Sequence, residues 1–212
     1  MTNKISIIIP VIRPKNIPNL KRSIKKNAGI PRSQYEILTE EDTKRIGAPK
    51  MVKKLTEQSK YSLVMFIGDD CLPQPDFLKE ASKAMESLPK KWGLVGLNDM
   101  QRPTDHSPTH WLAHKKLLEY CEEFFHTGYI HQYCDNELHL WAVLLNQYVR
   151  ADNAKIFHDH VGFRNKNKDF YTNVNESDDK DLKRVYDFEA QEHDRLLFEI
   201  RKQIIINKFN NN

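Results

Sequence analysis

The sequence lacks an excess of charge of one sign, and this argues against nucleic acid as the main partner. Its 33 lysines and arginines are offset by 29 aspartates and glutamates, so the formal net charge of the 212 residues is only +4. Nucleic-acid binding usually goes with a clear basic surplus. The basic stretch at residues 15–32 could face an anionic ligand, but a solvated helix face is its more ordinary interpretation.

Cysteines and long apolar runs are also scarce. Cys71, Cys121 and Cys134 are odd in number and form no C-x-x-C pair, which indicates neither a zinc knuckle nor a disulfide framework and fits a reducing compartment. The apolar run near the N-terminus is only a few residues long before Pro10, too short for a signal peptide's core or a membrane span. We therefore expect a soluble, cytoplasmic protein with no transmembrane segment.

In the first third of the chain, apolar runs of strand length alternate with segments of helical periodicity. Residues 5–12 (ISIIIPVI), 35–40 and 61–68 have the composition of strands, and the first and third are continuously apolar, as in strands buried on both faces. Residues 16–28 and 48–60 place apolar side chains at helical spacing. The alternation predicts an α/β fold with an open, mostly parallel twisted sheet, flanked by helices and carrying its ligand site at the carboxyl ends of the strands.

The second part of the chain predicts a helix, a strand, two helices, a strand and a long amphipathic helix, at residues 75–88, 92–99, 109–124, 136–149, 154–160 and 182–206. In the last helix, the residues expected to face inward are Leu182, Val185, Leu196, Leu197 and Ile200. We find no internal repeat and no linker. The sequence therefore predicts a single domain over residues 1–206 and a frayed tail at 207–212.

Two adjacent carboxylates, Asp69 and Asp70, stand where the third predicted strand stops. Like charges repel, so such a pair is stable only beside a positive charge. A divalent cation is the economical solution, and oxygen ligands favour Mg²⁺ or Mn²⁺, which keep positions open for substrate phosphates. The alternative is that one of the two simply caps the helix predicted to begin near Pro75.

Three segments in order along the chain, ISIIIPVIRP, EEDTKRIG and LVMFIGDDCLPQPDFL, resemble the first half of family-2-like GT-A nucleotide-diphospho-sugar glycosyltransferases. The resemblance covers roughly residues 4–165 and implies a GT-A fold, in which an Asp-x-Asp signature carries the metal that binds the donor's diphosphate. Gly68 stands where the first acid of that signature is usual. The resemblance therefore implies that Asp70 ligates Mn²⁺ or Mg²⁺ and that Asp69 meets the ribose or a metal-bound water.

The same resemblance implies the residues that contact the nucleotide sugar. They are Pro10, Val11, Ile12, Arg13, Glu41, Asp42, Arg45, Lys50, Gly68 and Asp69. Arg13 and Arg45 can each offer a planar fork to phosphate or uracil. Simple exposed charge is an equally good explanation for these two arginines.

The segment YCDNELHLW resembles the acidic motif that opens a helix beneath the acceptor site and carries the general base of inverting members. The matching residues are Asp135, which we favour, and Glu137. Asp135 could instead be a helix N-cap, and the two roles can coexist. The flanking His131 and His139 are more ordinarily structural.

His158 and His160, in the segment IFHDHVG, share one face of a predicted strand because alternate residues of a strand point the same way. Some GT-A enzymes close the metal site with a late histidine, and the resemblance implies that role for His160 first and His158 second. A purely structural pair at a strand end is the alternative.

The function implied by the resemblance is metal-dependent transfer of a sugar from a nucleotide-diphosphate sugar, with a UDP-sugar favoured, to a glycan or other hydroxyl acceptor, with inversion. Two alternatives stay open. A metal-dependent phosphohydrolase or nucleotidyltransferase would use the same acids and histidines, and a non-catalytic GT-A domain would hold a nucleotide or glycan without turnover. The glycine at position 68 is the best support for the second alternative.

Overall fold

The computed structural model describes residues 4–102, 106–167, 169–177 and 179–210. Its strands are β1 (Ile5–Val11), β2 (Tyr35–Glu41), β3 (Leu63–Phe66), β4 (Cys71–Pro73), β5 (Leu94–Asn98), β6 (Trp111–His114) and β7 (Tyr148–His158). Its helices are α1 (Ile17–Asn27), α2 (Ala48–Gln58), α3 (Phe77–Ser87), α4 (Leu118–Cys121), α5 (Cys134–Leu144), α6 (Phe170–Glu176), α7 (Lys180–Val185) and α8 (Phe188–Asn210). Short 3₁₀ turns lie at Pro14–Asn16, Arg32–Gln34, Lys115–Leu117 and Val161–Phe163.

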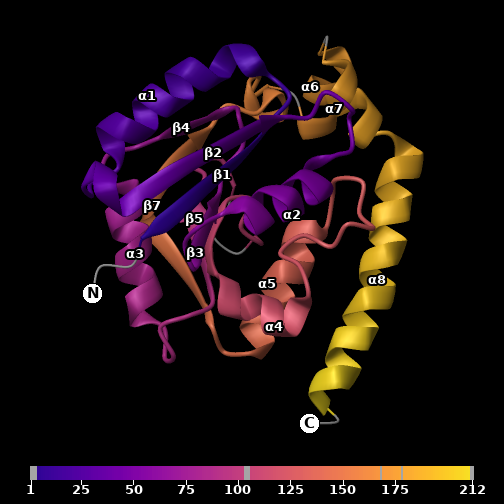
Figure 1. Ribbon diagram of the computed structural model, residues 1–212. Coiled ribbons are helices and arrows are strands. Elements are labelled where there is room, and N and C mark those ends of the chain that lie inside the picture. Colours follow the sequence, from indigo (N-terminus) through magenta and orange to yellow (C-terminus); the bar gives the residue numbers. More distant parts are fainter. Residues whose placement is uncertain (1–3, 103–105, 168, 178, 211–212) are drawn as a thin grey trace.

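Within the described ranges the strands form one mixed sheet in the order β2-β1-β3-β6-β5-β7-β4, flanked by helices (Figure 1). Strand β1 pairs in parallel with β2 and β3, and β5 pairs in parallel with β7. Strand β6 is antiparallel to β3 and β5, and β4 is antiparallel to β7. The predicted α/β fold is confirmed, and the sheet is more mixed than we expected.

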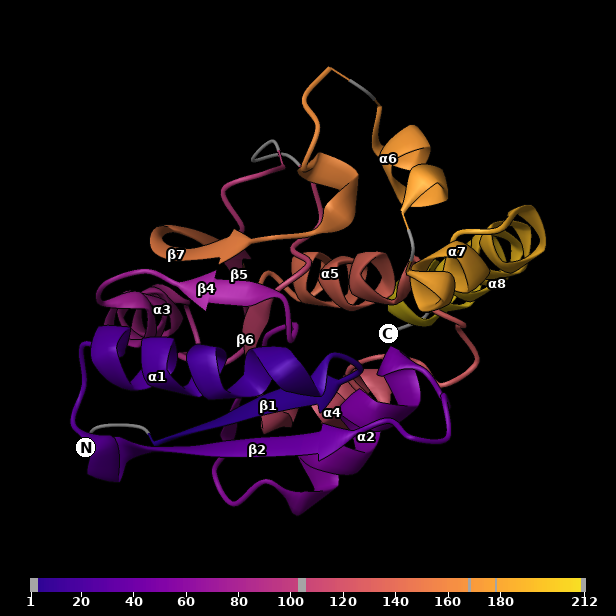
Figure 2. The same cartoon turned by 90° about the horizontal axis from the view of Figure 1, so that it is seen from above.

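The core lies on both faces of this sheet. Ile7 and Ile9 of β1 pack with α1 and α3 on one face, while Ile8 packs with α2, α4 and α5 on the other. A strand buried on both faces needs apolar residues at successive positions, which explains the continuous run ISIII. Helix α8 lies on the opposite side of the molecule from α1 and α3 (Figure 1, Figure 2).

The prediction of one helix over 109–124 is wrong. Trp111, Leu112 and Ala113 are fully buried in β6, at the centre of the sheet between β3 and β5. Only residues 118–121 of the segment form an α-helix. Burial between two strands decided the local structure here against the helical spacing of the apolar residues.

Two other predicted helices have different bounds in the structure. Helix α5 ends at Leu144, and residues 148–149 already belong to β7, which begins earlier than we expected. The long helix predicted over 182–206 is divided into α7 and α8. Helix α8 continues to Asn210 and so includes much of the segment expected to fray, while residues 211–212 lie outside the described residues.

The expected inward face of that last segment is only partly right. Leu182 and Val185 of α7 are buried, and Leu197 of α8 is partly buried against the core. Leu196 and Ile200, however, are 48% and 61% exposed. Among the described residues, the structure contains no helix that combines the length and the apolar character needed to cross a membrane.

Candidate active site

The sheet brings three distant parts of the chain to one edge. Because β6 is antiparallel to β3, Trp111 at the start of β6 pairs with Phe66 at the end of β3, which puts His110 at the edge where β1 and β3 end. In the pairing of β4 with β7, Cys71 is opposite His158. The carboxyl ends of β1 and β3, the beginning of β6 and the end of β7 therefore converge.

A cavity of about 520 Å³ opens at this edge. The residues predicted from the sequence that line it are Pro10, Ile12, Arg13, Asp42, Arg45, Gly68, Asp69, Asp70, Asp135, His158 and His160. Most of the candidate residues thus surround one space, although they come from segments up to 150 positions apart in the chain.

Four of the predicted residues lie outside the described lining of this cavity: Val11, Glu41, Lys50 and Glu137. The side chain of Val11 is buried in the core, because alternate residues of a strand share a face and Val11 therefore points to the same packed face of the sheet as Ile7 and Ile9. Glu41 and Lys50 are exposed at the surface. The geometry does not support direct contacts between these side chains and a ligand in the cavity.

The positive charge beside the two adjacent carboxylates is an arginine. One guanidinium nitrogen of Arg13, Nη1, lies 2.7 Å from Asp69 Oδ1 and 3.4 Å from Asp70 Oδ2. The other, Nη2, reaches Asp179 Oδ2 at 3.2 Å. Arg13 therefore supplies part of the positive charge that two adjacent carboxylates need.

Asp69 holds the turn after β1 in place. Its Oδ2 accepts hydrogen bonds from the backbone N–H groups of Ile12 and Arg13, at 2.8 and 2.6 Å, and its Oδ1 accepts from the Arg13 side chain. The side chain is almost fully buried. Both oxygens are committed to these contacts, so the expected contact with ribose or a metal-bound water is not favoured by the geometry.

Asp70 is the carboxylate that faces the cavity floor. Its Oδ1 lies 3.4 Å from Nε2 of His158. Burial alone would raise the pKa of Asp70, but His158, Arg13 and His160 outweigh burial and hold this pKa well below its usual range. Neither Asp69 nor Asp70 caps α3, which begins seven residues later and is preceded by Asp76.

Gly68 leaves room for this arrangement. A Cβ atom at position 68 would lie 2.8 Å from Asp70 Oδ1 and 3.4 Å from His110 Nε2. Real Cβ atoms essentially never approach another atom as closely as the first of these distances. An acid at this position would therefore require the carboxylate of Asp70 to shift.

Asp42 shapes the turn between β2 and α2. Its carboxylate oxygens accept hydrogen bonds from the backbone N–H groups of Ile46 and Gly47, both at 2.8 Å. Gly47 has φ of 95°, a conformation that favours glycine. Asp42 therefore positions the wall that carries Arg45, in addition to lining the cavity itself.

Three buried histidines form the cavity floor. The ring centroids of His110 and His158 are 4.6 Å apart, and those of His158 and His160 are 5.2 Å apart. Burial, followed by the neighbouring His158, lowers the pKa values of both His110 and His160 to about 3. These two rings are therefore neutral at physiological pH and can offer a nitrogen lone pair.

His110 was not identified from the sequence. It stands in a segment we expected to be helical, and its position at the site follows only from the antiparallel placement of β6. Its Nε2 lies 3.1 Å from Cys71 Sγ and its Nδ1 lies 3.1 Å from Thr109 Oγ1. The neighbouring histidines at positions 106 and 114 lie in the same local segment and carry no information about these long-range contacts.

Asp135 lines the same cavity and is not a helix cap. Tyr133 occupies the N-cap position of α5, and Asp135 follows in the first turn. Its Oδ1 accepts a hydrogen bond from the N–H of Asn136 at 3.0 Å. Burial raises the pKa of Asp135, while Arg102 and the backbone N–H groups only partly oppose the rise. A carboxylate with a raised pKa in a cavity is a candidate general base.

Glu137 has a structural position. It is 3% exposed, accepts a hydrogen bond from the Tyr129 hydroxyl at 2.8 Å, and binds the Arg201 guanidinium through both oxygens at 2.6 and 2.7 Å. These contacts join α5 to α8. The geometry gives Glu137 no access to the cavity, which weighs against its prediction as an alternative base.

Asp194, on α8, is the second residue near the cavity, after His110, that was not identified from the sequence. It is fully buried and accepts hydrogen bonds from the backbone N–H groups of Ile130, His131 and Gln132 at 2.7–2.8 Å. These three residues line the cavity. An aspartate in a predicted amphipathic helix carries no special signal, and the partners of Asp194 are more than 60 positions away.

His131 and His139 differ in position. His131 lines the cavity, and burial lowers its pKa to about 4, with Asp194 partly opposing the effect. His139 lies outside the described lining and packs edge-on against Tyr148, with ring centroids 4.2 Å apart. The structural interpretation from the sequence fits His139 well.

Comparison with known proteins gives matches in structure alone. No family model matches the chain, and no curated protein matches it in sequence. S. aureus TarS (residues 1–349) has a TM-score of 0.59 and 17% identity over 73% of this chain. A mannosyltransferase from Pyrobaculum calidifontis, solved with GDP-Man and Mn²⁺, has a TM-score of 0.62 and 15% identity over 74%.

Glucosyl-3-phosphoglycerate synthase from Mycobacterium tuberculosis, solved with Mn²⁺, UDP-glucose and phosphoglyceric acid, gives a TM-score of 0.55 and 11% identity over 74% of this chain. The match covers 60% of the TarS chain, 57% of the mannosyltransferase and 72% of the synthase. These proteins are GT-A glycosyltransferases. The predicted GT-A fold is confirmed, and the chain spans about 60% of the length of the TarS chain.

Proposed function

We propose that this GT-A protein is a metal-dependent glycosyltransferase that uses Asp135 as its general base. The observation that carries the proposal is the division of the cavity. Asp70, with a lowered pKa, faces histidines on the floor, while Asp135, with a raised pKa, faces the same space from the first turn of α5. Two acids with opposite pKa shifts suit two different tasks in one reaction.

The residues on the cavity floor fit a divalent ion. Asp70 offers a carboxylate oxygen, and His160 and His158 offer imidazole nitrogens. Carboxylate and imidazole are suitable ligands for Mn²⁺, and carboxylate oxygen for Mg²⁺. The two ions are also present in structures of the synthase named above. When bound, such an ion would neutralise charge on the departing diphosphate.

Arg13 would assist the same region. Its guanidinium lies between Asp69 and Asp70 at the end of β1, where Nη1 contacts both acids. Asp69 fixes its position through the backbone and the side chain. A held guanidinium at the cavity edge is suited to bind a phosphate oxygen of a nucleotide diphosphate.

Asp135 would accept the proton of the acceptor hydroxyl. Its raised pKa brings the group closer to neutral pH than an ordinary aspartate, which favours proton transfer in the transition state. Direct displacement of the diphosphate by the hydroxyl that Asp135 activates would invert the anomeric centre.

A UDP-sugar is the favoured donor, and a glycan or other hydroxyl compound is the acceptor. TarS has been solved with UDP-GlcNAc and the synthase with UDP-glucose, whereas the mannosyltransferase has been solved with GDP-Man. Pro10, Ile12, Asp42 and Arg45 line the side of the cavity proposed for the nucleotide. These lining residues support a nucleotide site but do not determine which nucleobase the nucleotide carries.

The proposal is tested by donor binding. In calorimetric titrations with UDP-sugars, we expect measurable affinity with Mn²⁺ and loss of that affinity in chelator or in Asp70→Asn. The matched control is Asp76→Asn, an exposed acid outside the described cavity lining with the same change in chemistry. Undiminished affinity in Asp70→Asn, or in wild type with chelator, would remove the metal from the proposal.

A non-catalytic domain that binds a nucleotide is the second candidate, and Arg13 is the observation in its favour. The arginine already neutralises the two acids that the sequence suggested for a metal. Such a protein would bind the donor without an added ion and would not turn it over. Slow hydrolysis of a UDP-sugar that depends on Mn²⁺ would exclude this candidate.

A further inference from the structure

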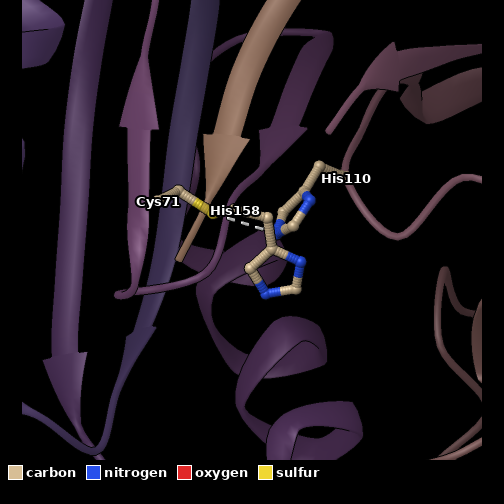
Figure 3. Close-up of side chains that lie close together, drawn as sticks. All are labelled: Cys71, His110 and His158. Atoms are coloured by element: carbon tan, nitrogen blue, oxygen red, sulfur yellow. Dashed lines mark hydrogen bonds between the residues drawn. The ribbon is translucent and has the colours of Figure 1, made fainter. Parts of the chain in front are cut away.

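We propose that Cys71, His110 and His158 form a second metal site, of thiolate and imidazole ligands, that binds Zn²⁺ separately from the donor's ion. The ligand atoms that these three residues offer all lie within 4.8 Å of one another. Figure 3 shows the three side chains converging from three segments of the chain. The inference goes beyond the proposed function and does not depend on a nucleotide sugar.

The cluster is buried and is built by the sheet. Cys71 begins β4, His110 precedes β6 and His158 ends β7, and these residues are only 2%, 2% and 9% exposed. The pairing of β4 with β7 sets Cys71 opposite His158. Cys71 and His110 are 39 positions apart, so no short spacing motif in the sequence indicates the site.

A relay of hydrogen bonds orients His110 as a ligand. Thr109 Oγ1 donates to Asp99 Oδ2 at 3.1 Å and therefore has only lone pairs to offer to His110 Nδ1, also at 3.1 Å. Nδ1 must then carry the ring proton, and Nε2 presents its lone pair toward Cys71. Metal-binding histidines commonly donate their second ring N–H to such a partner.

The spacing of two of the three ligand atoms already suits an ion. Tetrahedral ligands about 2.3 Å and about 2.0 Å from zinc are about 3.5 Å apart, and Sγ of Cys71 is 3.1 Å from Nε2 of His110. Gly68 leaves space here, since a Cβ at that position would lie 3.4 Å from His110 Nε2 and 3.6 Å from Cys71 Sγ. The buried, unpartnered Nδ1 of His158 is an independent sign of a missing ligand among the described residues.

The chemistry of the three ligand atoms determines which metal the cluster prefers. Thiolate and imidazole favour Zn²⁺ or similar transition metals over Mg²⁺ and Mn²⁺, which prefer oxygen. Assigning His158 to this cluster leaves His160 as the imidazole for an ion beside Asp70. The bound zinc would join three strand ends directly beneath the cavity.

The test uses Co²⁺ as a spectroscopic substitute for Zn²⁺, added to the metal-free full chain without nucleotide. We expect a thiolate-to-cobalt charge-transfer band and the visible bands of four-coordinate Co²⁺, with one ion per chain and displacement by Zn²⁺. Cys71→Ser should abolish the charge-transfer band. Cys121→Ser, which alters another buried cysteine, should keep it.

Thr109→Val provides a second variant that leaves every ligand in place. Loss of the relay should weaken Co²⁺ binding roughly 10- to 100-fold with little change in the band, and Thr109→Ser should restore the affinity. A wild type without the charge-transfer band, or a band that survives Cys71→Ser, would overturn the inference. Because no nucleotide is present, these outcomes are separate from success or failure of donor binding.

Discussion

The two sides of the cavity use their carboxylates differently. On the strand-end rim, residues 10–13, 42–47 and 68–70, the oxygens of Asp42 and Asp69 are committed to backbone N–H groups and hold the turns in shape. On the second-half wall, residues 130–136, Asp135 accepts only a local hydrogen bond from Asn136 among the bonds described. Asp42 and Asp69 therefore maintain the shape of the rim, whereas Asp135 is free to act on a ligand.

The difference also concerns charge. Asp70, at the inner end of the rim, has an arginine and histidines around it, so its pKa is lowered. Asp135 lies where burial outweighs the more distant Arg102, so its pKa is raised. Acids of the same type thus acquire opposite protonation behaviour within one cavity, because one has close cationic or hydrogen-bonding partners and the other does not.

The sharpest test of the comparison is Asp135→Asn. If the wall acid is the general base, its loss should lower the transfer rate roughly 10²- to 10⁴-fold, while donor affinity stays near wild type because the rim is intact. Initial transfer rates and donor titrations on the same preparation measure both quantities. Glu137→Gln is the matched control, since it makes the same acid-to-amide change two residues away.

That control separates the two acids of α5. Retained transfer in Asp135→Asn together with lost transfer in Glu137→Gln would move the base to Glu137. Retained transfer in both variants would remove this segment from the mechanism and leave the second-half wall with a binding role only.

Glu137→Gln should lower the stability of the protein, and this is the second largest of the expected effects. The neutral amide leaves the Arg201 guanidinium without its bidentate partner, and we expect the free energy of unfolding to fall by about 2 kcal/mol. Urea denaturation with an unchanged dependence on denaturant is the measurement. Stability equal to wild type would show that the contact between α5 and α8 is not held by this ion pair.

The smallest expected effect is in the pH dependence. Since the pKa of Asp135 is raised in the native state, transfer should decline with falling pH at a higher pH than an ordinary aspartate, whose pKa is about 3.9, would give. A raised native pKa also means that the carboxylate destabilises the native state at neutral pH, and that this cost disappears as the pH falls through that pKa.

Asp135→Asn removes the same cost. The variant should therefore exceed wild type in melting temperature at neutral pH, by an amount that shrinks to zero in acid. Melting curves across the acidic range check this expectation. A difference between the two proteins that does not change with pH would contradict the raised pKa.

The sequence predicted what local pattern controls. The run ISIII identified a central strand, and the end of the apolar run over residues 61–68 placed two acids at a strand end. The sequence favoured Asp135 over Glu137 by resemblance alone, because the two acids are two positions apart and the rotation of their helix, which decides the side that each faces, depends on the fold. The long-range partners of His110 and Asp194 depend on β6 and α8, and no local spacing carries that information.

The hydrogen bonds that Asp194 accepts link the long C-terminal helix α8 to the wall of the cavity. Three consecutive amide protons, those of Ile130, His131 and Gln132, are held by one carboxylate on α8. They exchange with solvent deuterium only when these hydrogen bonds open. Their protection therefore reports the free energy of separating residues 130–132 from Asp194, so that one exchange measurement follows the contact between α8 and the ligand wall.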